Sequence, residues 1–424
     1  MELLLTYLFI RCEINMINVI GGVYREKCLK PSWNDIFGSG GRAAIAIAQM
    51  GSDVHLHAYV PQIFIDEFQY KIDLIDQVSF ALTSYQTDEE ITFNYDHGLD
   101  PIMPPLTNKK NKIELDVENV LIFGMLECSF KTKSIYAVYD PQNTLSTEPF
   151  SKTGSIAKHL ALVLNEHEAR ILNNCPEDKD IYDIIASLHI KEKAEVIVVK
   201  RGPEGAIVSY GNRTFNIPAY KTDNVWKIGS GDCFSAHFAN NWIVNKDKPE
   251  VAAHKASIAT SYFCNTSVLP FPFVLGNYSP VPIMRESVNL TNTTIYIAGP
   301  FFTLSQIWLI EQVRYNLQEM GLQVISPYHD IGIIDPNNAS RAEQAEISAQ
   351  DLNAIVRSDV VFGIADGNDP GTVFEIGYAV SLGKKVILLA ENCPKNDLTM
   401  FCNENVEITH DYVTAIYKTR WSTL

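Results

Sequence analysis

The sequence predicts an α/β protein of two domains, a parallel-sheet domain with a small antiparallel lid and then a smaller doubly wound domain. Three observations lead to this prediction. The chain has 424 residues, which is too many for one ordinary hydrophobic core. Short β-branched runs alternate with helical patterns in two separate series, as in parallel sheets covered by helices. A stretch at 272–292, rich in Pro, Asn and Ser, separates the two series and is the expected linker.

The first series occupies 16–271 and supplies the larger expected domain. Its elements are, in order, a strand at 17–22, a helix at 42–51, strands at 117–124 and 134–140, a strand and helix within 160–172, a strand at 194–202 and a helix at 232–244. The segment 80–98 shows a different pattern and is expected to form an antiparallel excursion from the main sheet. We therefore treat it as a candidate lid.

The second series occupies 293–424. Strands are expected at 294–299, 322–327, 359–365 and 384–390, with helices at 305–321 and 341–358 and a further helix after 369. Because strand and helix alternate throughout, a parallel sheet is again expected. Ligands of such sheets bind beyond the carboxyl ends of the strands.

Composition favours small-molecule chemistry. The chain has 34 basic and 50 acidic residues, a formal charge of −16, and no basic run, so neither nucleic acid nor an anionic membrane is an expected partner. Its eight cysteines lack a C-x-x-C pair, which suggests neither a zinc site nor disulfides and fits a reducing cytoplasm. The apolar start at 1–15 is too short to span a bilayer. We interpret it as an N-terminal extension, with Met16 as an alternative initiator.

A single glutamate, Glu375, follows the glycine-rich loop DGNDPGT at 366–372. The pattern places it in the first turn of an apolar helix, at the carboxyl end of an expected strand. In that position the helix dipole would lower the pKa of the carboxylate, and a permanently ionised carboxylate suits a nucleophile. The alternative is an acid that only stabilises the start of the helix.

Three motifs in the second series resemble the nucleoside 2-deoxyribosyltransferase family. They are IYIAGPFFT at 295–303, QDLNAIVRSD at 350–359 and DPGTVFEIGYA at 369–379. The resemblance implies a flavodoxin-like or Rossmann-like doubly wound domain that needs no cofactor. It also implies Glu375 as the nucleophile that forms a glycosyl-enzyme ester, and Asp351 as the carboxyl that shuttles a proton.

The same resemblance implies a nucleoside pocket around these carboxyl groups. Cleavage of an N-glycosidic bond builds positive charge on the sugar, so an ionised carboxylate and a separate acid have distinct tasks. Further expected substrate-binding residues are Asp369, Tyr296, Gly299 and Phe302, although Tyr296 and Phe302 fit an ordinary core equally well. His329 and Asp330 also follow a strand. The family completes its site with residues of a neighbouring subunit, so a homo-oligomer is expected, with Asn396 and Met400 as candidates.

Motifs in the first series resemble the ribokinase-like (PfkB) family of sugar and nucleoside kinases. They are GSGGRAA at 38–44, NEHE at 165–168 and GSGD at 229–232. The resemblance implies ATP and Mg²⁺ as cofactors. It assigns Asp232 as the catalytic base and Glu168 as the metal residue, with the remaining roles as follows: an anion hole of Gly229, Ser230 and Gly231, Asn165 assisting Glu168, and substrate contacts from Glu26 and Gly41.

Three positions depart from the kinase pattern. Trp226 and Lys227 stand where the family usually has Asp-Thr, and Ile45 replaces an asparagine. Lys227 could supply a fixed charge where relatives use a monovalent cation. Two functions therefore stay open. One is a bifunctional cytoplasmic enzyme of nucleotide salvage that has kinase and N-glycosidic activities. The other is a degenerate kinase domain that senses a nucleotide and gates a glycosidase.

Overall fold

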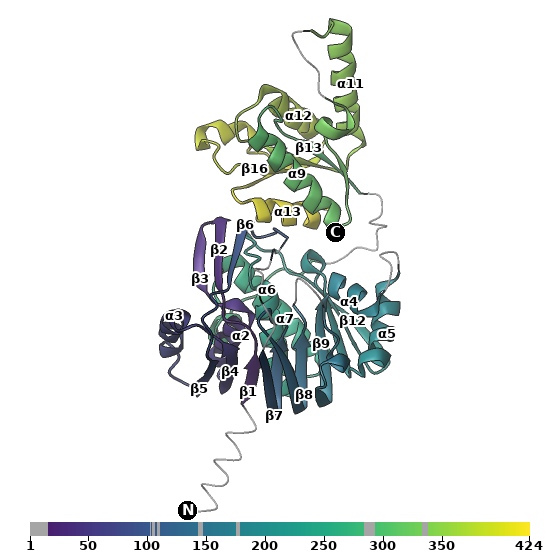
Figure 1. Cartoon of the computed structure of the whole chain (residues 1–424). Helices are drawn as coiled ribbons and strands as arrows, with labels where there is room; N and C mark the ends of the chain where they lie inside the picture. The colour runs from purple at the N-terminus through teal and green to yellow at the C-terminus, as the bar shows by residue number, and fades with distance from the viewer. Residues whose placement is uncertain are drawn as a thin grey trace, which may run out of the picture. The chain divides into compact units, whose positions relative to one another are not determined.

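The computed structural model describes residues 16–101, 103, 107, 111–142, 147–174, 179–283, 293–332 and 338–424. The chain divides into two compact units (Figure 1). Unit 1 comprises Met1–Thr222 and Trp226–Pro282, and unit 2 comprises Asp223–Val225 and Ile283–Leu424. The expected N-terminal extension at 1–15, and 284–292 of the expected linker, lie outside the described residues.

Unit 1 is built on a nine-stranded sheet within the described part of the chain. In spatial order its strands are β12 (Arg213–Ile217), β11 (Ala206–Tyr210), β10 (Val196–Lys200), β9 (Ile156–Asn165), β8 (Cys128–Asp140), β7 (Asn111–Phe123), β1 (Ile17–Ile20), β4 (Val54–Tyr59) and β5 (Phe80–Tyr85). In this spatial order, all neighbouring strands between β10 and β5 pair in parallel, whereas β11 and β12 add an antiparallel edge. This parallel-rich sheet confirms the predicted fold class.

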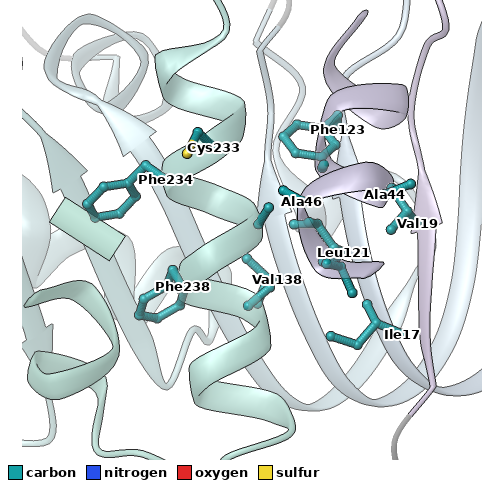
Figure 2. Packing of buried hydrophobic residues seen from close by; sticks show 14 of the residues in the cluster. Ile17, Val19, Ala44, Ala46, Leu121, Phe123, Val138, Cys233, Phe234 and Phe238 are labelled. Carbon is teal, nitrogen blue, oxygen red and sulfur yellow. The ribbon is translucent and has the colours of Figure 1, made fainter. Parts of the chain in front are cut away.

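Helices cover both faces of this sheet, because alternate side chains of each strand point to opposite faces. Leu121 and Phe123 join one apolar cluster with α2 and α6, whereas Val120 and Ile122 join another with α4 and α5. Figure 2 shows α2 and α6 with their side chains over the strands. The helices of unit 1 are α2 (Gly38–Gln49), α3 (Gln62–Asp73), α4 (Glu166–Asn173), α5 (Ile181–Glu192), α6 (Ser230–Ile243), α7 (Pro249–Thr266) and α8 (Pro272–Leu275), with 3-10 turns at Phe150–Lys152 and Gly202–Glu204.

Strands β7 and β8 are unusually connected. Each has 13 residues, and they pair in parallel although only 124–127 lies between them. Thirteen extended residues span about 40 Å, whereas four reach at most about 14 Å, so straight strands could not be joined in this way. Each strand must therefore bend back on itself. The register is interrupted at Glu118 in β7 and at the facing Ile135 in β8, which places the bends there.

A second, three-stranded sheet of unit 1 lies beside the first residues of α2. Its order is β3 (Trp33–Ile36), β2 (Arg25–Lys30) and β6 (Thr92–His97). The β2–β3 pair is antiparallel and the β2–β6 pair is parallel. The expectation that 80–98 forms one antiparallel excursion is wrong in detail, because β5 completes the edge of the large sheet whereas β6 joins the small one.

Unit 2 is a parallel sheet with the order β14 (Gln323–Ile325), β13 (Thr294–Ala298), β15 (Val360–Ile364), β16 (Lys385–Leu389) and β17 (Val406–Thr409). The order reverses direction between β13 and β15, which creates a crevice at their carboxyl ends. The helices are α9 (Leu304–Glu319), α10 (Pro327–Asp330), α11 (Arg341–Arg357), α12 (Pro370–Ser381) and α13 (Tyr412–Trp421), with a 3-10 segment at Lys395–Phe401. The predicted doubly wound fold is confirmed.

Two further features concern the described residues. None of their helices is both long and apolar enough to cross a membrane. Their cysteines are present as thiols outside any disulfide, namely Cys28, Cys128, Cys233, Cys264, Cys393 and Cys402. The structure thus shows no disulfide within the described ranges, and Cys12 and Cys175 lie outside them.

Candidate active sites

Glu375 lies on α12, the helix that follows β15 of unit 2. Asp369 caps this helix, because its Oδ2 accepts hydrogen bonds from the Thr372 backbone N–H at 2.7 Å and from Thr372 Oγ1 at 2.9 Å. The helix begins at Pro370, so Glu375 is in its second turn. The expectation of a first-turn carboxylate is therefore wrong, since the cap and the proline start the helix before the glutamate is reached.

Tyr296 of β13 holds Glu375. The phenol is 0% exposed and donates a hydrogen bond to Oε1 of Glu375 at 3.0 Å. Burial and the charge of Asp351 raise the pKa of Glu375 to about 8, although the bond from Tyr296 lowers it. The expected lowering of this pKa is wrong, because burial and a second carboxylate outweigh the helix dipole. Burial also raises the pKa of Tyr296, which keeps its hydroxyl a donor.

Asp351 is the second carboxyl group of this site. It lies on α11, and burial raises its pKa to about 6. Its Oδ1 is buried and has no hydrogen-bond partner among the residues that the structure describes. Because the charge of Asp351 acts on both Glu375 and Tyr296, the three side chains share one environment. Between the two pKa values the carboxyl pair holds a single proton, as acid–base pairs in active sites do.

Gly299 and Phe302, which follow β13, have different surroundings. A Cβ at Gly299 would lie 2.9 Å from Cδ1 of Ile364, so this glycine allows close packing beneath the crevice. Phe302 is 71% exposed. Within one copy of the chain, Phe302 therefore does not form part of a buried wall.

The remaining predicted residues of unit 2 have structural contacts or lie on the surface. Nε2 of His329 pairs with Oε1 of Glu311 at 2.9 Å. Asp330 accepts a hydrogen bond from the Ser326 N–H at 2.8 Å. Asn396 is exposed, and Met400 is 88% exposed. The structure thus brings Tyr296, Asp351 and Glu375 together and leaves Asn396 and Met400 on the surface.

The glycine loop of unit 1 leads into α6. Gly229 precedes the helix with φ of +79°, and no side chain among the described residues caps it. The first N–H groups of a helix have no intrahelical acceptor, so the start of α6 offers amides to an anion. Ser230 Oγ accepts a hydrogen bond from Lys227 Nζ at 3.0 Å, and burial lowers the pKa of Lys227. Asp232 follows in the first turn and is buried.

We predict that Gly229→Ala destabilises unit 1 severely. The left-handed backbone costs a residue with a side chain about 1–2 kcal/mol, and here the new Cβ would also overlap the guanidinium of Arg42. Gly211 is the matched control, because its φ is +56° and a Cβ there meets nothing within 4 Å. Thermal unfolding should show a clearly larger loss for Gly229→Ala than for Gly211→Ala. Equal losses would contradict the close contact with Arg42.

Arg42 of α2 is a residue that the sequence analysis missed. It is 1% exposed, and its Nη1 donates to Oε1 of Glu26 at 2.9 Å and to Oδ2 of Asp232 at 2.8 Å. Its Nη2 donates to Oε2 of Glu26. Burial alone would lower the pKa of Arg42, but the two carboxylates raise it above its ordinary value. Glu26 and Asp232, both predicted from the sequence, are therefore joined by one guanidinium.

Asn165 and Glu168 contact each other at the start of α4. Oδ1 of Asn165 accepts a hydrogen bond from the Glu168 N–H at 2.8 Å, and Oε2 of Glu168 accepts one from the Asn165 N–H at 2.7 Å. This reciprocal pair is a capping box. Helix capping therefore explains why Asn165 and Glu168 are three positions apart. The capping box uses Oε2 of Glu168, so Oε1 stays available for a ligand. Burial and the charge of Asp140 raise the pKa of Glu168 to about 7.

Asp140 and Lys200, which the sequence analysis also missed, lie at the carboxyl ends of β8 and β10. Asp140 is 0% exposed, and its Oδ2 accepts hydrogen bonds from Lys200 Nζ at 2.5 Å and Ser235 Oγ at 2.6 Å. Burial lowers the pKa of Lys200, but Asp140 and Glu168 outweigh burial and raise it. A Cβ at Gly231 would lie 3.5 Å from Lys200 Nζ. This ammonium group is therefore close to the start of α6.

The surroundings of Asp140 suit a hydrated Mg²⁺. Its Oδ1 is buried without a hydrogen-bond partner in the described ranges, and Asp140 lies near enough to Glu168 for its charge to raise the pKa of Glu168. The described residues contain no group of three or more His, Cys, Asp or Glu that could enclose a metal ion. Mg²⁺ commonly binds one or two carboxylates and otherwise water and phosphate oxygens, so Asp140 and Glu168 fit such an ion.

Curated and solved proteins resemble parts of the chain. A 2-dehydro-3-deoxygalactonokinase of Haloferax volcanii is 34% identical over 65 residues, which is 15% of this chain and only 20% of the relative. A fructokinase double mutant from Vibrio cholerae O395 is 14% identical with a TM-score of 0.48, over 63% of this chain and 98% of its own. A ribokinase from Giardia lamblia is 14% identical with a TM-score of 0.48, over 62% and 99%.

Two family models match separate segments of the chain. The model of the pfkB family of carbohydrate kinases matches residues 148–261, which include Glu168, Lys200 and Asp232. The model of nucleoside 2-deoxyribosyltransferase matches residues 295–407, which include Tyr296, Asp351 and Glu375. Two successive parts of the chain are therefore similar to two enzyme families, the first to pfkB carbohydrate kinases and the second to nucleoside 2-deoxyribosyltransferases.

Proposed function

We propose that the chain is a bifunctional nucleoside-metabolising enzyme. The C-terminal domain, 293–424, cleaves or transfers the N-glycosidic bond of a nucleoside, and the N-terminal domain, 16–271, transfers phosphate from ATP to a sugar or nucleoside hydroxyl. The observation that carries the first activity is the buried contact between Tyr296 and Glu375 beside Asp351. The second is supported by Asp232 in the first turn of α6.

In the proposed glycosidic reaction, a carboxylate oxygen of Glu375 attacks the anomeric carbon of the sugar. Glu375 has the higher pKa of the pair, so it first passes the shared proton to Asp351. The bond from the anomeric carbon to the base nitrogen then breaks, and its electron pair leaves with the base, which takes this proton from Asp351. Tyr296 stabilises the ionised nucleophile through its hydrogen bond to Oε1. Water or a second base then attacks the glycosyl ester and releases Glu375. Asp369 is proposed to border the nucleoside through Oδ1, since Oδ2 caps α12.

The single proton shared by Asp351 and Glu375 leads to a pH prediction. As the pH increases, kcat/KM should rise around pH 6, where the pair loses its first proton. It should fall above about pH 8, where the pair loses its second proton and with it the acid. Asp351→Asn removes the charge that raises the pKa of Glu375, so this pKa should fall below 8. The profile should then become a single rising limb, with rates lower by about 10²–10⁴-fold.

Substrates with good leaving groups provide the control for this prediction, because they need no acid. They should lose least in Asp351→Asn when initial rates are measured from pH 5 to pH 9. A bell-shaped profile that persists in the variant, or equal losses for every leaving group, would contradict the role of Asp351.

In the proposed kinase reaction, Asp232 takes the proton of the acceptor hydroxyl while the oxygen of that hydroxyl bonds to the γ-phosphorus of ATP and ADP leaves. The amides at Gly229, Ser230 and Gly231 and the ammonium of Lys200 face the developing charge. Asp140 and Glu168, with Asn165 behind Glu168, would hold Mg²⁺, which neutralises charge on the phosphates when bound. Gly41 is proposed to approach the acceptor through its backbone, since a Cβ there would instead lie 3.0 Å from Cε2 of Phe68.

Product analysis tests the two activities directly. The full-length protein is incubated with a panel of nucleosides, and release or exchange of the base is followed by chromatography. A second series uses ATP, Mg²⁺ and a panel of sugars and nucleosides, with ADP and phosphorylated product as readouts. Base release without ADP formation would retain the first activity and reject the second. Light scattering during size-exclusion chromatography tests the proposed homo-oligomer.

A second candidate function for unit 1 is nucleotide sensing without phosphoryl transfer. The observation that favours it is Lys227, which is placed beside Ser230 at the start of α6 and differs from the family pattern. A partly buried ammonium there can hold a nucleotide phosphate without any catalytic step. Under this function ATP binds without turnover and changes the rate of base release, because linked sites must affect each other's affinity. Calorimetric titration with ATP, paired with base-release rates, distinguishes the two functions.

A further inference from the structure

Glu26, Arg42 and Asp232 form a buried network of ion pairs that links three elements of unit 1. Glu26 belongs to β2, Arg42 to α2 and Asp232 to α6. Both oxygens of Glu26 accept hydrogen bonds from Arg42, and Oδ2 of Asp232 accepts one from Nη1. Oδ1 of Asp232 has no hydrogen bond to any residue in the described ranges.

Two further contacts hold the guanidinium of Arg42 in addition to its hydrogen bonds. The face of Arg42 lies over the ring of Phe37, with Cζ 4.7 Å from the ring centroid. A Cβ at Gly229 would overlap Cζ and Nε of Arg42, so the group also lies directly against the glycine loop. The bidentate ion pair with Glu26, the ring of Phe37 and the loop at Gly229 together leave the guanidinium little freedom to rotate. Its direction therefore sets the direction of the Asp232 carboxylate.

We propose that these three residues are a positioning relay for the kinase reaction, in which Glu26 fixes Arg42 and Arg42 fixes Asp232, so that Oδ1 alone is presented to the acceptor hydroxyl. The proposal rests on the proposed kinase function. It changes the role of Glu26, which acts through Arg42 and has no oxygen left unbound for the substrate. Arg42 is a positioning residue, since the group that takes the proton is Asp232.

The relay predicts how two substitutions combine in steady-state kinetics. Glu26→Gln and Arg42→Lys should each lower kcat by about 10²-fold, the effect of a misplaced reacting group, and should change the KM of the acceptor less than about twofold. The double variant should lose little more than either single variant, because both act on the same carboxylate. If Glu26 instead contacted the acceptor directly, Glu26→Gln would raise KM at unchanged kcat. The effects of the two substitutions would then multiply in the double variant.

Arg25→Met is the matched control for these kinetics. Arg25 lies on the same strand as Glu26 and pairs with Glu67 at 2.7 Å on the surface. Its loss should leave kcat and KM within about twofold of the wild type, as expected for an exposed ion pair. Arg42→Met should be slower than Arg42→Lys. A gain in kcat in Arg42→Met would overturn the relay, because it would identify the guanidinium as an obstruction.

Thermal unfolding tests the relay even if the wild type transfers no phosphate, in which case the proposed kinase function fails separately. Glu26→Gln should lower Tm in the wild-type background, because Arg42 loses a charged partner. In the Arg42→Met background the same substitution should raise Tm, because it removes one of two unpaired buried carboxylates. If Arg42→Met does not fold, Arg42→Lys replaces it, and Glu26→Gln should then lower Tm less than in the wild type. The same loss in both backgrounds would overturn the relay.

Discussion

Glu375→Ala should abolish N-glycosidic chemistry while leaving unit 2 folded. Without the carboxylate no glycosyl ester can form, and loss of a nucleophile costs more than about 10⁴-fold in well-studied enzymes. The fold should persist, because among the described residues the side chain has a hydrogen bond to Tyr296 alone, and its buried charge is unfavourable. Mass spectrometry of acid-quenched reactions should detect a glycosyl adduct on the wild type and none on the variant.

Glu346→Ala is the control for this experiment, because Glu346 is an exposed glutamate on α11. It should retain the wild-type rate and the adduct. If Glu375→Ala keeps more than a hundredth of the wild-type rate, or if the adduct maps to another residue, the nucleophile is misassigned.

Asp232→Asn should remove phosphoryl transfer and preserve nucleotide binding. The variant keeps the shape of the side chain and an oxygen that can accept the bond from Arg42, but it loses the base, which is worth about 10²–10⁴-fold. Nucleotide affinity should stay within about twofold, because the proposed anion hole consists of backbone amides and Lys200. ADP formation and calorimetric titration with ATP measure the two quantities.

Asp247→Asn is the matched control for Asp232→Asn. Asp247 lies just after α6 and pairs with Lys255 at 2.7 Å near the surface. It should leave both turnover and affinity unchanged. Loss of ATP affinity in Asp232→Asn alone would indicate that the carboxylate supports the loop rather than the chemistry.

Much of the fold could be predicted because apolar alternation is a local signal. Leu121 and Phe123 face one side of the sheet and Val120 and Ile122 the other, which is the period expected of a doubly covered strand. The partner of a strand is not a local property. The segment 80–98 has two strand patterns separated by a polar stretch, as an antiparallel hairpin would, and only tertiary packing assigns β5 and β6 to different sheets.

The candidate sites likewise contain residues that local sequence predicts and residues whose role depends on distant partners. Glu375 and Asp232 follow glycine loops at strand ends, so their positions could be predicted from sequence spacing. Arg42 could not, because its role depends on Glu26, 16 positions away, and Asp232, 190 positions away. The pKa of Glu375 was predicted in the wrong direction, since the motif contains neither Asp351 nor the depth of burial.

The bent strands β7 and β8 have a consequence for the order of folding. Asn111 pairs with Cys128, 17 positions later, whereas Asn18 of β1 pairs with Val120, 102 positions later. Closing the longer loop costs about 1.6 kcal/mol more in chain entropy. We therefore expect β7 and β8 to form before the first strand of the chain joins the sheet. Pulsed hydrogen exchange during refolding should protect the amides of 119–123 while those of Ile17–Ile20 still exchange, so that assembly spreads outward from the middle of the sequence.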